Sequence, residues 1–288
     1  MRTLKSWVTA VALVAMVAAS GYAAEVEQHE TVHKTFAGAK SIEVDNVNGG
    51  IQVVAWNGPD IQADIEKTVR ADDSDRAEAA KREVKLDIGE NGGEVKLYVD
   101  GPFRCHCNDG GFRSRNNMNE SRHRGYRVDY DFQLKVPAGT KLYLSTVNHG
   151  AIKLSNTSGD FDVENVNGGI EMVEISGSGR VHAINGKVNV VFAKNPAGPS
   201  SFGSLNGAVD IAFQPGLSAD ASVKTFNGGI YTDFPVTYLP RTPATGQRQN
   251  GKFVYRSNEF TGIRIGGGGP EYKFETLNGN IRIINRGK

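Results

Sequence analysis

Three side chains between residues 101 and 126 could hold a metal ion. Cys105, Cys107 and His123 offer two thiols and an imidazole, which are groups that Zn²⁺ and Cu prefer in proteins. The Cys-X-Cys spacing differs from the Cys-X2-Cys of common zinc sites. In an oxidising compartment a strained local disulfide or a bond to another chain also competes with metal binding. Structural or incidental thiols are therefore favoured, and the sequence predicts no metal site and no cofactor.

The same stretch is rich in arginine. Five of these side chains form a hypothetical anionic-ligand patch: Arg104, Arg113, Arg115, Arg122 and Arg124. Guanidinium groups bind phosphate and carboxylate, so the patch would suit a phosphorylated or acidic glycan. The competing interpretation is a solvated loop whose charge is partly offset by Asp109 and Glu120, and this interpretation is favoured.

Three acidic residues alternate along one expected strand. Asp160, Asp162 and Glu164 therefore share a face, and paired carboxylates could bind Ca²⁺ or cleave a polysaccharide. Alternating acids are also typical of the solvated face of an ordinary strand, and no base or arginine partner is evident from the sequence. A nucleophile motif of the Gly-X-Ser-X-Gly type is missing as well. No catalytic residue is predicted.

A recurring phrase must position these side chains: an apolar residue, Asn, a turn residue and a short strand. Its asparagines, which we expect to be structural turn residues, are Asn48, Asn148, Asn167, Asn185, Asn206, Asn227 and Asn278. Asn and Gly tolerate positive φ, so the phrase indicates a sharp change of chain direction. The copy at Asn148 has one extra residue, which predicts a local bulge.

The spacing of the phrase predicts a stacked array. The central asparagines, from residue 148 to residue 227, are 19, 18, 21 and 21 residues apart, so one rung has about 20 residues. In-register stacking would place Asn on Asn, and the mostly small polar residues two positions earlier could hydrogen-bond between rungs. A meander of hairpins is the alternative, since Asn-Gly is also a hairpin signal. The solenoid is favoured over the meander.

The first 24 residues are typical of a secretory signal peptide. A positive start with Arg2 and Lys5 precedes an apolar stretch, and small residues near Ala23 suit signal peptidase. Loss of this segment would change the formal net charge from +1 to −1, so no nucleic acid is expected as a partner. No later segment is apolar enough to cross a bilayer, and we expect a periplasmic or extracellular, cell-surface location.

Residues 25–288 are expected to form a single β-helix domain. Residues 72–83 predict one short capping helix near its N-terminal end. Residues 101–126 predict an exposed Arg-, Gly- and Asn-rich insertion, and residues 237–252 predict a second loop. The last strand, around residues 281–284, is expected to be an uncapped edge.

The pattern resembles the bacterial exported proteins of the putative-adhesin family, a β-helical domain of unknown function. The residues that carry the resemblance are Val136–Thr140 leading to Asn148, the Asn-Gly rungs, and Glu275–Ile283. The resemblance covers roughly residues 35–285 and implies a right-handed single-stranded parallel β-helix. It brings no catalytic residues, and the insertion at 101–126 departs from the family pattern.

These observations predict a non-enzymatic exported protein with an adhesin-like binding or scaffolding role at the cell envelope. Its partner would be an envelope glycan or a protein. One alternative is a polysaccharide-active β-helix enzyme, a lyase or hydrolase, which rests on fold analogy alone. The other is a structural protein that self-associates end to end through its last rung.

Overall fold

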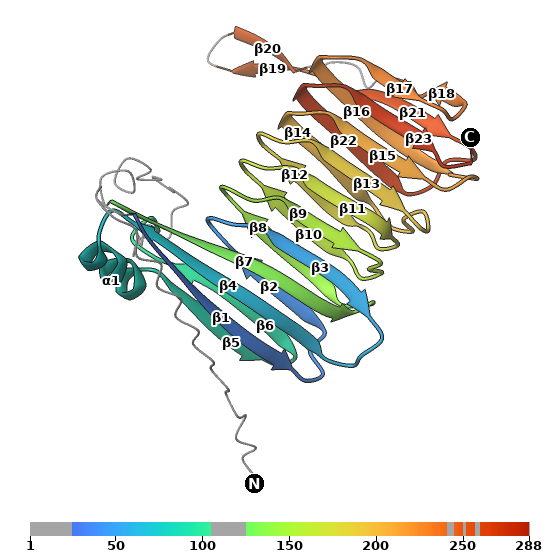
Figure 1. The fold of residues 1–288 in the computed structure, drawn as a ribbon. Coiled ribbons are helices and arrows are strands. Elements are labelled where there is room, and N and C mark those ends of the chain that lie inside the picture. The colour runs from blue at the N-terminus through green and yellow to red at the C-terminus, as the bar shows by residue number, and fades with distance from the viewer. Residues whose placement is uncertain (1–24, 105–124, 241–244, 250–251, 257–259, 288) are drawn as a thin grey trace. The chain divides into compact units, whose positions relative to one another are not determined.

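The computed structural model describes residues 25–104, 125–240, 245–249, 252–256 and 260–287 (Figure 1). The regular structure of the described chain is β-strand apart from one helix, as predicted, because apolar and polar residues alternate along most of the strands. It divides into two compact units, unit 1 up to Ala151 and unit 2 from Ile152 onward. The signal peptide expected over residues 1–24 lies outside the described residues.

The described part of unit 1 contains eight strands and one helix. Their bounds are β1 (Val26–Phe36), β2 (Ser41–Asp45), β3 (Ile51–Trp56), β4 (Ile61–Ala71), α1 (Ser74–Glu83), β5 (Lys85–Asn91), β6 (Glu94–Asp100), β7 (Tyr126–Pro137) and β8 (Lys141–Thr146). The strands form two layers with the orders β1-β4-β7-β3 and β8-β2-β6-β5. Their inward residues, such as Ile42, Val53 and Leu144, are buried between the layers.

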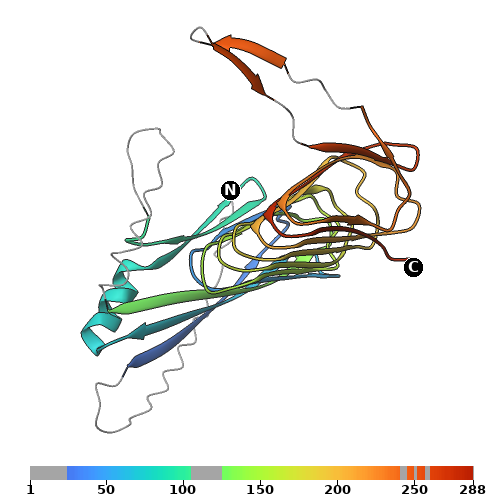
Figure 2. The same ribbon diagram turned by 90° about the horizontal axis from the view of Figure 1, so that it is seen from above.

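Unit 2 contains the remaining strands. They are β9 (Ile152–Ser155), β10 (Phe161–Asn165), β11 (Ile170–Ile175), β12 (Gly179–Ala183), β13 (Val188–Phe192), β14 (Ser200–Asn206), β15 (Val209–Phe213), β16 (Ala219–Asn227), β17 (Ile230–Thr232), β18 (Val236–Tyr238), β19 (Thr245–Gln249), β20 (Lys252–Arg256), β21 (Thr261–Ile265), β22 (Glu271–Asn278) and β23 (Ile281–Asn285). Two layers have the orders β9-β11-β13-β15-β23-β17 and β18-β21-β16-β22-β14-β12-β10, and β19 pairs with β20. Figure 2 shows the two layers of unit 2 facing each other across its interior.

The predicted right-handed single-stranded parallel β-helix is wrong. The strands belong to two large mixed sheets of 10 and 11 strands, and several neighbours are antiparallel, including β1–β4, β4–β7, β5–β6 and β16–β21. Residue alternation places side chains on a face, but it does not determine whether adjacent strands run in the same direction. At β5–β6, Gly92 and Gly93 adopt positive φ and form the tight turn of a hairpin.

Part of unit 2 nevertheless repeats in parallel register. Ile170 pairs with Ile152 on one side and with Val188 on the other, and Val188 pairs with Val209. Equivalent apolar residues therefore stack in columns, and this regular packing forms the core of the unit.

The last copy of the phrase does not lie at an end. β22 is placed between β14 and β16, and β23 between β15 and β17. The expectation of an uncapped edge around residues 281–284 is therefore wrong, because both sides of β23 are paired. The edge strand of this layer is β17.

The two non-repeating segments have structure of their own. Helix α1 begins after Asp73, whose side chain accepts a hydrogen bond from the Arg76 backbone N–H, and Ala77 and Ala80 are buried against the strands. The sequence predicts a loop over residues 237–252. In the described part of this range the structure instead has the end of β18, strand β19 and the start of β20.

Candidate interaction surface

The asparagines of the phrase form a ladder in unit 2. In each pair the Nδ2 of one Asn donates to the Oδ1 of the next, at 2.9 Å for Asn185 to Asn167 and for Asn206 to Asn185. The distance is 2.7 Å for Asn278 to Asn206 and for Asn227 to Asn278. The ladder therefore follows the spatial order of the strands and not the order of the chain.

A second column lies beside the ladder, two positions earlier in each phrase. The hydroxyls of Ser204, Thr276 and Thr225 donate to glycine carbonyls of neighbouring rungs, at 2.8–3.0 Å. Polar groups buried at a corner are costly unless they are bonded. This column satisfies the carbonyls at which the backbone changes direction, and so holds each corner at a fixed spacing.

Close packing explains the glycine of the phrase better than positive φ does. A Cβ on Gly207 would lie 2.1 Å from the Gly186 carbonyl oxygen, and one on Gly279 would lie 2.1 Å from that of Gly207. Positive φ is found at Gly49. In the copy of the phrase at Asn148, which has one extra residue, His149 has a φ of 61°, and this left-handed conformation accommodates the insertion.

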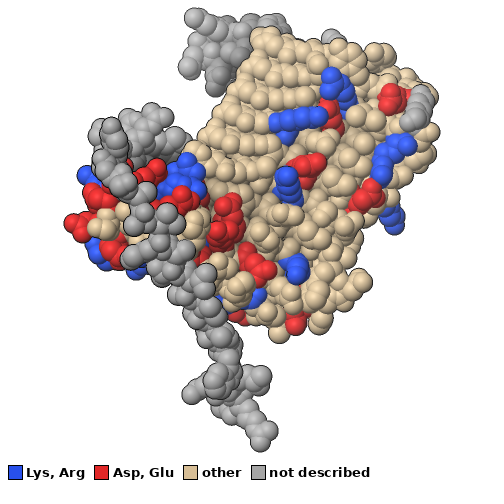
Figure 3. Space-filling view, in the orientation of Figure 1, with Lys and Arg blue, Asp and Glu red and all other residues tan. Residues whose placement is uncertain are grey.

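The apolar residue that precedes each Asn forms an exposed row. Leu205, Leu277 and Phe226 occupy adjacent strands in that order and are 41%, 40% and 71% exposed. In the view of Figure 3, the margin beside β12 and β14 carries neither basic nor acidic side chains. We name the asparagine ladder with this row the Asn–Gly corner. It combines apolar groups and amides on a hydrogen-bonded frame.

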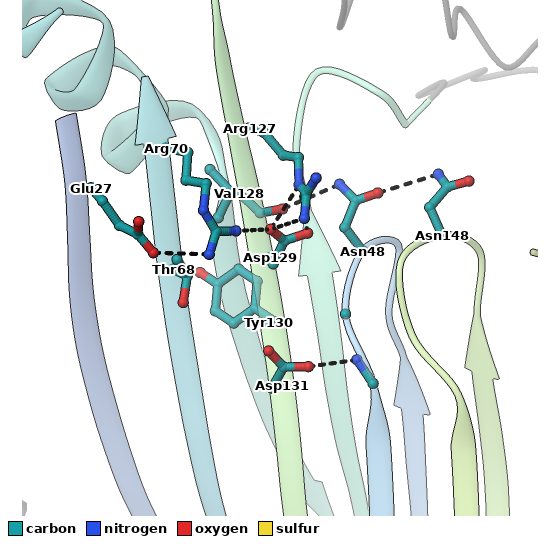
Figure 4. Close-up of polar contacts among 12 residues, drawn as sticks. Glu27, Asn48, Thr68, Arg70, Arg127, Val128, Asp129, Tyr130, Asp131 and Asn148 are labelled. Carbon is teal, nitrogen blue, oxygen red and sulfur yellow. Dashed lines mark hydrogen bonds and ion pairs between the residues drawn. The ribbon is translucent and has the colours of Figure 1, made fainter. Parts of the chain in front are cut away.

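In unit 1 a charged network lies next to the pair Asn48 and Asn148 (Figure 4). Asn148 donates to Asn48 at 3.2 Å, and Asn48 in turn donates to the Val128 carbonyl. The next residue, Asp129, is buried and is bound by Arg70 at 3.1 Å and by Arg127 at 2.8 Å. These guanidinium groups neutralise a carboxylate of the chain itself, so we assign the network a structural role.

A buried lysine completes this part of unit 1. Lys67 donates to the Val84 carbonyl at the end of α1 and lies over the Tyr130 ring, 5.6 Å from its centre. Burial lowers the pKa of Lys67 and raises the pKa of Tyr130. The ammonium thereby joins the helix to the sheet.

The acids on β10 have an arginine partner that sequence reasoning missed. Arg180 on the neighbouring strand β12 forms an ion pair with Glu164 and lies 3.9 Å from Asp162. Burial raises the pKa of Asp162, an effect that Arg180 partly opposes. In the register Asp162 lies directly opposite Arg180, and Glu164 lies two residues further along β10, diagonal to Arg180. The carboxylates are thus partly neutralised by a neighbouring strand.

Most of the proposed metal and anion ligands lie outside the described residues: Cys105, Cys107, His123, Arg113, Arg115, Arg122 and Arg124. Arg104 is described. It binds Asp45 at 2.9 Å and stacks over the Tyr98 ring at 4.3 Å, so its charge is already paired. Within the described ranges, no group of three His, Cys, Asp or Glu side chains is arranged to hold a metal ion.

Sequence reasoning also missed His182 and the network around Asp129. His182 lies across from Gly203, and a Cβ at Gly203 would be 3.1 Å from the imidazole. Burial lowers the pKa of His182 and nearby Arg180 lowers it further, although Glu164 and Glu275 act in the opposite direction. Arg70 and Asp129 are 59 residues apart, and no local motif connects them.

The chain is similar to solved structures and to no known family. No protein-family model and no curated protein matches the chain. One similar solved structure is a putative cell adhesion protein from Clostridium sporogenes, with 12% identity over 90% of this chain and 100% of that one, and a TM-score of 0.38. Another is a putative adhesin from Bacteroides fragilis, with 10% identity over 90% and 97% of the two chains, and a TM-score of 0.41.

Both similar proteins carry adhesion names, as the resemblance seen in the sequence predicts. Because both TM-scores are below 0.5, these structures assign no fold or activity to this chain. No helix in the described ranges combines the length and apolar character needed to span a membrane.

Proposed function

We propose that this chain is a non-enzymatic exported protein that binds a glycan at the cell envelope in an adhesin-like or scaffolding role. Export rests on the signal-like sequence of residues 1–24. Binding rests on one observation, the exposed apolar row of Leu205, Leu277 and Phe226 beside a ladder of amides.

The chemistry of the Asn–Gly corner favours a neutral glycan. A carboxamide has two N–H donors and two acceptor lone pairs, so Asn206 retains hydrogen-bonding capacity beyond its two ladder bonds. Sugar hydroxyls match these groups, and the C–H faces of sugar rings can pack on Leu277 and Phe226. In the view of Figure 3 no charged side chain lies at this margin, and Lys187, in the copy of the phrase that leads into β13, is paired with Asp210 at 2.8 Å. The corner therefore offers an acidic polymer little unpaired positive charge.

The corner is also preorganised for a polymer. Its asparagines are fixed to one another, its hydroxyls are bonded to backbone carbonyls, and the strands repeat about every 4.8 Å. A ligand would find these groups already ordered, so binding would cost little side-chain entropy.

The test measures retention of the purified protein on immobilised neutral and acidic envelope polysaccharides, together with any new reducing or unsaturated ends. We expect retention on a neutral polymer, without cleavage and with little dependence on salt. The double substitution Phe226→Ser and Leu277→Ser should weaken retention by about tenfold or more, because two apolar contacts are lost.

Tyr143→Ser is the matched control, because Tyr143 is also a half-exposed aromatic residue, on β8 of unit 1. It should leave retention unchanged. If the protein is retained on acidic polymers alone, and salt abolishes this retention, the Asn–Gly corner is not the binding site. That result would support the arginine patch of residues 104–124. New ends would show that the protein is an enzyme and direct attention to Asp160, Asp162 and Glu164.

A further inference from the structure

Exposed hydrophobic side chains are concentrated in one short segment of unit 2. Of the eight large hydrophobic residues that are exposed in the described ranges, four lie between residues 226 and 238: Phe226, Ile230, Tyr231 and Tyr238. Concentrated apolar exposure of this kind marks interaction sites. The segment includes β17, which is an edge strand with one neighbour, β23.

The β17 edge lacks the protection that the edges of unit 1 have. Exposed edge strands usually carry charges, especially Lys, that prevent pairing with another chain. In unit 1, β1 carries Glu27, Glu30 and Lys34, and β5 carries Lys85, Asp87 and Glu90. Strand β17 consists of Ile230, Tyr231 and Thr232 and has no charge and no proline.

The backbone of β17 presents unpaired groups in a defined pattern. The Asp233 N–H donates to Ile283, and the Gly229 carbonyl accepts from Ile281, so residues 229 and 233 face β23. Backbone groups alternate along a strand, and Tyr231 therefore faces β23 as well. The N–H and C=O groups of Ile230 and Thr232 point to the open edge.

We propose that two copies of this chain associate through β17, paired antiparallel about a two-fold axis at Tyr231. In this register Ile230 lies opposite Thr232 of the second copy, and each of these two pairs makes two backbone hydrogen bonds. Tyr231 lies opposite Tyr231 of the second copy at a non-hydrogen-bonded position. The pairing uses every outward backbone group of β17.

The side chains agree with this register. Tyr231 lies opposite Arg282 on the outer face, and its hydroxyl would lie within 2.5 Å of a Cβ on Gly229, so the ring leans over that glycine. Asp233 of the second copy would face Gly229, so no side chain opposes it there, and its Oδ2 already accepts a hydrogen bond from the Asn285 backbone N–H of its own chain. Ile230, which is 39% exposed, would become buried.

Charge makes a second copy of β17 a better partner than another edge of the protein. Pairing β17 with β1 or β5 would place Ile230 and Tyr231 against Glu, Asp and Lys side chains. The edge strand β18 is also uncharged, but Pro235 and Pro240 flank it, and proline lacks the N–H that strand pairing needs. Pairing β17 with itself opposes only neutral side chains and leaves Asp233 opposite glycine. Because a two-fold contact closes on itself, the expected product is a dimer and not a filament.

Disulfide trapping tests the register in a Cys105→Ser, Cys107→Ser background. Residues at a non-hydrogen-bonded pair have Cα atoms about 4.5 Å apart, within the range that a disulfide spans. Tyr231→Cys should therefore form a covalent dimer under mild oxidation. Tyr238→Cys on β18 is the control, because Tyr238 is 74% exposed against 56% for Tyr231 and would cross-link faster if collisions alone were responsible.

Sedimentation tests the interface without cysteines. The wild-type protein should be a dimer. The Tyr231→Glu variant should be a monomer, because like charges would meet at the two-fold axis. An equal mixture of the Tyr231→Glu and Tyr231→Lys variants should form a dimer again, because opposite charges would then meet. Equal cross-linking at positions 231 and 238 would overturn the proposal. So would a strict monomer up to about 1 mM, or open assemblies larger than a dimer. Glycan retention depends on Phe226 and Leu277, so the two proposals can fail separately.

Discussion

The edge strands of the two units differ in charge and in exposure. In unit 1 the outer strands β1 and β5 alternate charged residues with apolar ones, and the asparagine pair is closed by a carbonyl beside the buried Asp129. In unit 2 the edge strand β17 is neutral, and the asparagine ladder ends at the exposed residue Asn227. The charged edges of unit 1 oppose pairing with another strand, whereas the neutral edge strand β17 of unit 2 permits it.

The interiors differ as well. Unit 2 contains a cluster of rings in which Phe202, Phe213, Phe274 and Tyr272 contact one another at centroid distances of 5.4–6.4 Å. Unit 1 has one comparable described pair, Tyr130 and Phe132, and adds the buried polar groups Lys67 and Asp129. We therefore expect unit 2 to depend mainly on aromatic packing and unit 1 to depend more on polar contacts.

The largest expected effect tests this difference in the core. Phe274→Ala removes a fully buried ring and should lower the free energy of unfolding of unit 2 by about 3–5 kcal/mol. Urea unfolding can be followed by Trp56 fluorescence, which reports on β3 of unit 1, and by circular dichroism, which reports on both units. A Trp7→Phe background removes the other tryptophan. We expect the circular dichroism midpoint to fall and the Trp56 midpoint to stay.

Phe132→Ala in unit 1 is the reciprocal control, since Phe132 is also buried. It should shift the Trp56 transition. If both probes shift together for both variants, the units unfold as one cooperative body and the comparison of separate interiors fails.

A smaller effect is expected at the polar network of unit 1. Asp129→Asn keeps the shape but removes the charge that binds Arg70 and Arg127, and should cost about 1.5–3 kcal/mol in the Trp56 transition. Glu27→Gln also breaks an ion pair of Arg70, but Glu27 is 45% exposed, so it should cost less than about 1 kcal/mol. Equal losses for the two variants would show that burial of Asp129 has no special role.

The sequence predicted the strands and the stacking of like residues, because the period of two and the repeat of about 20 residues are local patterns. Three features could not be predicted from those patterns. Alternation along β4 is the same whether β4 runs parallel or antiparallel to β1. The position of β22 between β14 and β16, with β21 and β18 on the far side of β16, departs from the order of the chain. The ion pair of Arg180 with Glu164 depends on a register that only the folded sheet defines.

The smallest expected effect concerns His182 in unit 2. Its pKa is lowered in the folded state by burial and by Arg180, so the unfolded state binds its proton more readily. The stability that His182 contributes is therefore fully present above its unfolded pKa of about 6.5, and it is lost as the pH falls through the folded pKa. Lys273 acts in the same direction as Arg180, whereas Glu164 and Glu275 oppose it.

His182→Gln should reduce the loss of unit 2 stability between about pH 7.5 and about pH 5, measured as the change in the urea midpoint of circular dichroism. At about pH 7.5 the variant should differ little from wild type, because the imidazole is then neutral in both states. If the pH dependence is unchanged, ionisable groups other than His182 account for it, and the lowered pKa of His182 makes no measurable contribution to the stability of unit 2.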